Sequence, residues 1–123
     1  MELYNLDTEL TFGKYKGETV LDILSKDSSY ISYLLKEKDD FYITDQVYEA
    51  SIIYGYKGSI DEHVAQGHSA EEAINICKKA DPNKDYFKEK RKLYKDYLLK
   101  QYNQKLESQL SGNGNIIVKH SIF

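Results

Sequence analysis

The sequence predicts an α+β fold, on three observations. A glycine-bracketed turn follows a short run of β-type residues near the N-terminus, and apolar residues recur at helical spacing through most of the chain after it. Residues 115–119 then alternate in polarity up to Ile122 and Phe123, which indicates a possible short C-terminal strand. We expect a strand–turn–helix–helix module over residues 1–54 and a mostly helical extension over residues 55–123, packed as one globular unit.

The first expected element is a strand at residues 9–12 that leads into a tight turn. Gly13 and Gly17 bracket the turn, and glycine tolerates the positive φ that such a turn needs. Between them the turn presents two cations and one aromatic ring, a combination that suits phosphate and base together. These three residues are Lys14, Tyr15 and Lys16.

Two short helices are expected after the turn. Thr19, with Asp22 three residues later, predicts the start of a helix over residues 20–26. Asp27 then caps a second helix, which the charged residues 36–40 end. The apolar face of this second helix consists of Tyr30, Ile31, Leu34 and Leu35.

The end of the N-terminal module is less regular. Residues 41–43 form either a strand or an extended connector. Thr44 or Asp45 opens a helix that runs to about Tyr54, and a second glycine-bracketed turn at residues 55–58 follows it.

The C-terminal half reads as three helices. Two Ser/Glu pairs spaced as capping boxes predict a short helix that stops at Gly67 and a longer one up to Ala80. Asp81 as N-cap, with Pro82 in the first helical position, starts a long amphipathic helix over about residues 82–110. The two pairs are Ser59 with Glu62 and Ser69 with Glu72.

The long helix carries apolar residues at spacings of four and seven, which predict one stripe. The stripe is either core or a dimer seam, and a homodimer would use Tyr94, Leu98 and Tyr102. The whole stripe consists of Phe87, Tyr94, Leu98, Tyr102, Leu106 and Leu110.

Charge is distributed unevenly along the chain. The net charge is −3, but residues 82–105 hold eight bases against three acids, which gives this stretch a charge of +5. If the protein meets a polyanion, the long helix and the glycine turn are therefore the candidate surfaces. The candidate contact residues on the helix are Lys88, Arg91, Lys92 and Lys95.

Composition indicates an ordinary cytoplasmic protein, with 41% hydrophobic and 30% charged residues. No apolar run approaches the length of a membrane span, and the first residues lack the pattern of a signal peptide. The single cysteine, Cys77, excludes an internal disulfide.

Residues with catalytic or metal-binding chemistry are few. The adjacent acids at 39–40 and 61–62 lie where a solvated loop or a helix start explains them. His63, His68 and Cys77 lack both a zinc-site spacing and a fourth ligand. We therefore expect neither an enzyme nor a metal or other cofactor.

The turn and the helices after it resemble a known family. Phe-Gly-Lys-Tyr-Lys-Gly-Glu-Thr at residues 12–19 and Ser-Tyr-Ile-Ser-Tyr-Leu-Leu at residues 29–35 resemble the exodeoxyribonuclease X-like C-terminal domain, over about residues 10–47. Ser28 stands where that family usually has proline, and Tyr33 where it usually has tryptophan, a change that conserves packing. The resemblance implies a nuclease-associated module, because such exonucleases hold their metal on a separate domain for which this chain is too short.

We therefore expect a non-catalytic accessory protein that binds DNA or RNA largely without sequence specificity, through the turn and the basic helix. In the plainer interpretation the turn serves folding only, and the lysines are the solvated face of a helix. The alternative function is a protein-binding module, such as a phage-encoded inhibitor of a host enzyme or a small component of a virion or complex. The acidic first half of the chain favours that alternative.

Overall fold

The computed structural model describes residues 2–113, so the strand expected after residue 114 lies outside the described residues. The described part holds two short strands and five helices, which confirms the α+β class. It divides into a compact unit that ends at Arg91 and a second unit that begins at Lys92. The division expected at residue 54, which rests on the extent of the sequence motif, stays a prediction.

The sheet consists of two parallel strands, β1 (Glu2–Tyr4) and β2 (Phe41–Ile43). Parallel strands need a long crossover, and here the crossover contains the turn and helix α1 (Val20–Glu37). Residues 41–43 pair with β1 along their whole length and all three are buried, so this segment is a strand and not merely a connector. The register pairs Glu2 with Phe41, Leu3 with Tyr42 and Tyr4 with Ile43.

The strand expected at residues 9–12 is wrong. Glu9 forms only an isolated antiparallel bridge to Thr19. The loop satisfies its own backbone instead, because the Leu10 N–H donates to the Glu18 carbonyl (3.0 Å) and the Gly17 N–H donates to the Leu10 carbonyl (2.8 Å). The Leu10 side chain is buried in the core and anchors this closed loop.

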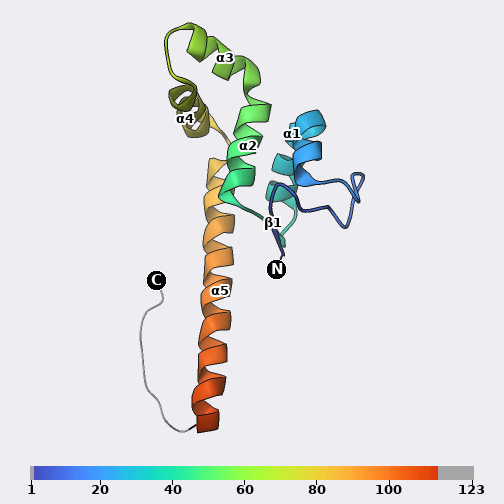
Figure 1. Ribbon diagram of the computed structural model, residues 1–123, viewed down its shortest axis with the longest axis vertical. Helices are drawn as coiled ribbons and strands as arrows, with labels where there is room; N and C mark the ends of the chain where they lie inside the picture. Colours follow the sequence, from blue (N-terminus) through green and yellow to red (C-terminus); the bar gives the residue numbers. More distant parts are fainter. Residues whose placement is uncertain (1, 114–123) are drawn as a thin grey trace. The chain divides into compact units, whose positions relative to one another are not determined.

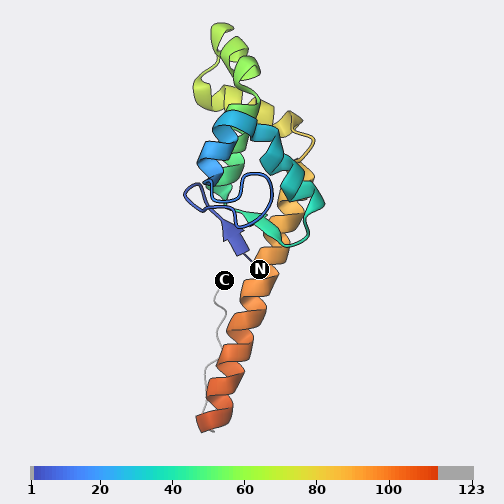
Figure 2. The ribbon, with the colours of Figure 1, turned by 90° about the vertical axis from the view of Figure 1, so that its right-hand side faces the viewer.

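Helix α1 combines the two helices expected after the turn. The Thr19 hydroxyl accepts the Asp22 N–H at 3.2 Å, which confirms the predicted cap. Asp27 has non-helical dihedrals (φ −153°, ψ 68°), and the axis kinks there. Figure 2 shows the two segments of α1 meeting at an angle.

Helices α2 (Asp45–Gly55) and α3 (Lys57–Ala65) follow each other with one residue between them. Of the two residues expected to open α2, Thr44 is the one that caps it. The turn expected at residues 55–58 and the cap expected at Ser59 are wrong. Tyr56 alone breaks the helix, and its carbonyl already accepts the Ile60 N–H at 2.9 Å, so Ser59 lies inside α3.

Helix α4 (Ala70–Ala80) begins with the complete capping box of Ser69 and Glu72, as predicted. Helix α5 (Lys84–Asn113) begins two residues later than Pro82. Asp81 does not act as its side-chain cap, because the Asp81 carboxylate accepts hydrogen bonds from two tyrosine hydroxyls instead.

The expected stripe on α5 does not continue the core. Phe87 is buried, but Leu98 is 44% exposed and Tyr102 is also exposed. Each step of four residues rotates about 40° around a helix with 3.6 residues per turn, so apolar residues spaced by four drift off one face. The side chain of Leu110, the last residue of the expected stripe, lies outside the described residues.

The core lies in the first unit, where α1 packs against α2 and covers the strands (Figure 1). The kinked α1 contributes more buried apolar residues than any other element. None of the helices among the described residues combines the length and apolarity needed to cross a membrane. The fully buried side chains are Leu10, Val20, Ile23, Leu24, Ile31, Leu35, Phe41, Val47 and Ile52.

Candidate nucleic-acid interface

The glycine turn (residues 13–17) has the geometry that its sequence predicts. Gly13 and Gly17 have φ values of 78° and 89°, which favour glycine. Gly13 has a second constraint, since a Cβ atom there would overlap the hydroxyl of Tyr30. The turn is therefore fitted to the helix beneath it as well as to its own backbone.

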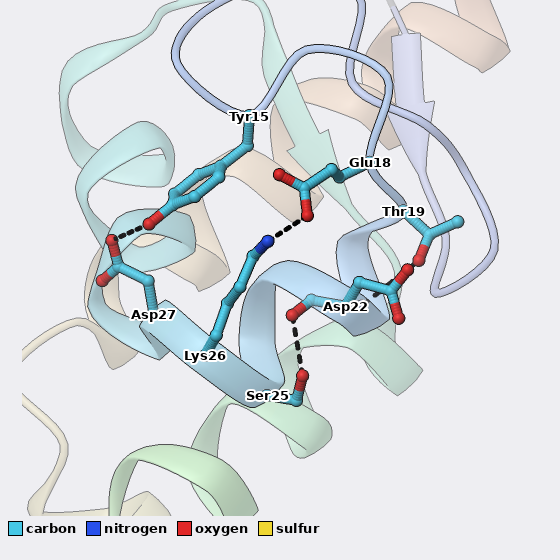
Figure 3. Close-up of polar contacts among 7 residues, drawn as sticks. All are labelled: Tyr15, Glu18, Thr19, Asp22, Ser25, Lys26 and Asp27. Carbon is cyan, nitrogen blue, oxygen red and sulfur yellow. Dashed lines mark hydrogen bonds and ion pairs between the residues drawn. The ribbon is translucent and has the colours of Figure 1, made fainter.

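Side chains of the turn converge on the kink of α1 (Figure 3). The Tyr15 hydroxyl donates to the Asp27 carboxylate at 2.8 Å, and the Lys14 ammonium lies 3.3 Å from the same oxygen. Lys26 forms an ion pair with Glu18. The two ammonium groups, of Lys14 and Lys26, lie 5.1 and 5.2 Å from the centre of the Tyr15 ring.

This arrangement shifts the titration of the groups involved. The hydrogen bond from Tyr15 lowers the pKa of Asp27, and Ser29 and Lys14 act in the same direction. The same carboxylate raises the pKa of both Lys14 and Tyr15. Lys14 and Tyr15 therefore have a structural role in holding the turn on α1, whatever else they bind.

Lys16 differs from its neighbours in the turn. Its side chain is exposed, and within residues 2–109 it makes no hydrogen bond or ion pair. Of the three residues predicted to bind in the turn, Lys16 is the one whose charge remains available to a ligand.

Three tyrosines form a series beside the turn, which we call the tyrosine ladder: Tyr15, Tyr30 and Tyr33. Tyr15 meets Tyr30 edge-on with ring centres 5.0 Å apart, and Tyr30 stacks on Tyr33 at 6.2 Å. Lys14 lies 5.3 Å from the centre of the Tyr30 ring. Tyr33 is 58% exposed, so it packs on Tyr30 while much of its side chain faces solvent.

The structure does not bring Lys88 and Arg91, the two candidate residues of α5 within the first unit, to the turn. Arg91 pairs with Asp45 at 3.2 Å, and Lys88 lines a groove between α2, α4 and α5. In Figure 1 the turn lies at the right edge of the first unit and α4 at the left, with α2 between them. Lys92 and Lys95 belong to the second unit.

Lys90 is a cation of α5 whose role sequence reasoning missed. Its ammonium donates to the carbonyls of Lys38, Asp39 (3.2 Å) and Phe41 (3.1 Å) and lies 5.1 Å from the Tyr42 ring centre. Burial lowers the pKa of Lys90. Its role is structural, because it joins the start of α5 to the connection between α1 and β2.

Asp81 is a buried carboxylate with two phenolic partners. The hydroxyls of Tyr48 and Tyr56 donate to it at 2.7 and 2.9 Å. Burial, followed by the bond to Asp81, raises the pKa of Tyr56 to about 12. Cys77 is buried nearby in the core.

Among the described residues, no three or more histidine, cysteine, aspartate or glutamate side chains gather closely enough to hold an ion.

The glycine turn, the kinked helix α1 and the first residues of the connection to β2 form one continuous local structure. A comparison with known families finds a match over the same part of the chain. Residues 10–39 match the exodeoxyribonuclease X-like C-terminal family. The matched segment contains the glycine turn, the tyrosine ladder and all of α1. No curated protein and no solved structure matches the chain.

Both ends of the exodeoxyribonuclease X-like segment coincide with structural contacts. It begins at Leu10, the buried anchor of the loop, and ends at Asp39, whose carbonyl accepts from Lys90. The sequence resemblance therefore rests on a contiguous piece of the fold, whereas α2 to α5 lie outside it.

Proposed function

We propose that this protein is a non-catalytic accessory protein that binds single-stranded nucleic acid on the tyrosine ladder. The observation that carries the proposal is the exposed ring of Tyr33, stacked on Tyr30 beside a turn with two lysines. An exposed ring next to cations can stack a base while the cations contact the backbone phosphates. The match to a family named for an exodeoxyribonuclease supports the same role.

The contacts within the protein indicate which residue would bind which part of the nucleic acid. Tyr33 takes the base, and Lys16 takes a phosphate because its charge is not engaged elsewhere in the described structure. Lys14 contributes less, since Asp27 already neutralises it. Lys88, Arg91, Lys92 and Lys95 remain candidates for further phosphate contacts.

The test is fluorescence polarisation with labelled single-stranded DNA, duplex DNA and RNA at two salt concentrations. Base stacking contributes about 1–3 kcal/mol, so Tyr33→Ala is expected to weaken single-strand binding about tenfold. With two phosphate contacts, affinity should fall about sevenfold for a fourfold rise in salt. Lys16→Ala should reduce that salt dependence.

A matched control separates stacking from a general loss of aromatic surface. Tyr54 is an exposed tyrosine on α2 that does not belong to the ladder, and Tyr54→Ala should leave binding unchanged. Equal weakening by Tyr33→Ala and Tyr54→Ala, or no binding at low salt, would contradict the proposal.

A second candidate function is protein binding through α5. Leu93 and Leu98 are both exposed on this helix, which favours contact with an apolar surface of another protein or of a second copy. A homodimer would use Tyr94, Leu98 and Tyr102. Sedimentation equilibrium tests the dimer, and a pull-down that retains one stoichiometric partner after nuclease treatment tests the other case.

A further inference from the structure

A second site lies in the groove between α2, α4 and the first turns of α5, which we call the lysine groove. It has a volume of about 520 Å³. Its base includes Tyr48 and Phe87, whose rings stack in parallel with centres 4.2 Å apart. A cavity of this size falls within the range of small-molecule sites.

Positive charge exceeds negative charge around the groove. Its two carboxylates already have partners, because Glu49 pairs with Lys78 (3.8 Å) and Asp45 pairs with Arg91 (3.2 Å). Three further lysines on the groove have no carboxylate within 4 Å among the described residues. They are Lys79, Lys84 and Lys88.

The three lysines are held together by the fold. Lys79 comes from the last turn of α4, and Lys84 and Lys88 come from the start of α5. The Lys84 ammonium donates to the backbone carbonyl of Lys79 at 2.9 Å, which places this charge at the C-terminal end of α4. Lys84 and Lys88 also face each other at a spacing of four residues, where like charges repel. A bound anion would relieve this repulsion.

The lysine groove is separate from the tyrosine ladder, because α2 lies between α4 and the glycine turn (Figure 1). A ligand in the groove therefore need not touch the tyrosine ladder, although Lys88 and Arg91, which line the groove, are also candidates for the phosphate contacts of a nucleic acid.

We infer that the lysine groove binds a small ligand with at least two phosphate groups, of about the size of a nucleoside diphosphate. Three clustered ammonium groups match a multiply charged anion, whereas a single carboxylate would leave most of the charge unpaired. The lysines contact the phosphates, and the apolar base of the groove receives the remainder of the ligand. This inference does not depend on the proposed nucleic-acid binding.

The experiment is calorimetric titration of the full chain with ADP, inorganic pyrophosphate and adenosine in metal-free buffer. The groove variant is Lys79→Gln with Lys88→Gln, which leaves the hydrogen bond of Lys84 intact. The matched control is Lys100→Gln with Lys105→Gln, an equal change of charge on exposed residues of the second unit. Circular dichroism checks that both variants are folded.

Saturable binding of ADP that the groove variant weakens at least tenfold, and the control variant leaves unchanged, is the expected result. No saturable binding at millimolar ADP, equal weakening by both variants, or adenosine binding as tightly as ADP would overturn the inference.

Two further titrations distinguish this inference from the proposed nucleic-acid binding. Tyr33→Ala should bind ADP as the unmodified chain does, even if it has lost single-stranded DNA. If the groove variant loses DNA binding and DNA displaces ADP, the groove is part of the nucleic-acid surface, and the inference of a separate small-ligand site is wrong.

Discussion

Asp27 is the residue on which the glycine turn depends. It occupies the kink of α1, accepts the Tyr15 hydroxyl and pairs with Lys14. The non-helical dihedrals of Asp27 direct its carboxylate toward Tyr15 and Lys14 of the turn. The turn motif and the kink of α1 therefore form a single structural feature.

The two glycines of the turn should respond differently to substitution. Alanine at either position adopts a positive φ at a cost of about 1 kcal/mol, but only at Gly13 does the new Cβ meet the Tyr30 hydroxyl. In urea unfolding, Gly13→Ala should lose about 2 kcal/mol and Gly17→Ala about half of that.

A double variant identifies the cause. Tyr30→Phe removes the overlapping oxygen, so it should restore part of the stability of Gly13→Ala while changing the parent chain little. Additive effects of the two substitutions would show that the hydroxyl is not the obstacle.

Sequence reasoning at this scale identified positions better than roles. Gly13, Gly17 and Thr19 behave as their residue types predict, because the determinants are local. The exposure of Tyr33 and the burial of the Lys90 ammonium depend on which distant element covers each residue. No local pattern distinguishes Lys90 from the lysines around it.

Among the elements, α5 is joined to the rest of the first unit by Phe87 and Lys90. Phe87 stacks on Tyr48 of α2, and Lys90 satisfies three carbonyls at the end of α1 and the start of β2. A helix with so polar a surface is fixed by these few contacts, since its own sequence forms no continuous apolar face.

Replacement of Lys90 tests this attachment. Lys90→Met keeps most of the side-chain volume but leaves the carbonyls without their charged donor, so the free energy of unfolding should fall by about 2 kcal/mol. Lys92→Met, on the same helix and exposed, should change it by less than about 0.5 kcal/mol. Similar values for the two variants in urea titrations would contradict this account.

The tyrosines on Asp81 predict an alkaline limit of stability. The pKa of Tyr56 is raised in the folded chain to about 12, above its ordinary value of 10.0. Its contribution is therefore fully present below pH 10 and is lost as the pH rises from there towards 12. The measurement is an absorbance titration of tyrosinate in the parent chain and in Tyr56→Phe. The substitution should remove one group that titrates near pH 12. Loss of a group near 10 would refute the assignment.

Helices were predicted more accurately than strands for a physical reason. Thr19, Thr44 and the pair Ser69 and Glu72 cap helices through hydrogen bonds within three residues, so short segments contain the whole signal. The pairing of β1 with β2 joins residues far apart in the chain, and residues 9–12 look equally suited to a strand. Asp81 failed as a cap because buried tyrosines from α2 and the α2–α3 junction compete for its carboxylate.

On the scale of the whole molecule, the described core belongs to the first unit. Every buried core residue lies between Tyr4 and Phe87, and the later part of α5 adds none among residues up to 109. Cooperative unfolding should therefore be a property of the first unit.

A truncation tests this division. A chain that ends after Lys95 keeps Phe87, Lys90 and Arg91 and should unfold in one urea transition with nearly the midpoint of the full chain. Circular dichroism should show the loss of helical signal from the removed residues only. A broad transition, or a midpoint far below that of the full chain, would show that the second unit stabilises the first.

The contact of Lys90 with the connection after α1 has a consequence for recombination. The segment that matches the exodeoxyribonuclease X-like family ends at Asp39, yet the carbonyls of Lys38, Asp39 and Phe41 are satisfied by an ammonium group from α5. A host protein that acquired residues 10–39 alone would carry two of these carbonyls, those of Lys38 and Asp39, without the ammonium group that binds them. In a new protein these carbonyls would need another donor. The structural unit therefore includes Lys90 of α5 and is larger than the segment that matches the family.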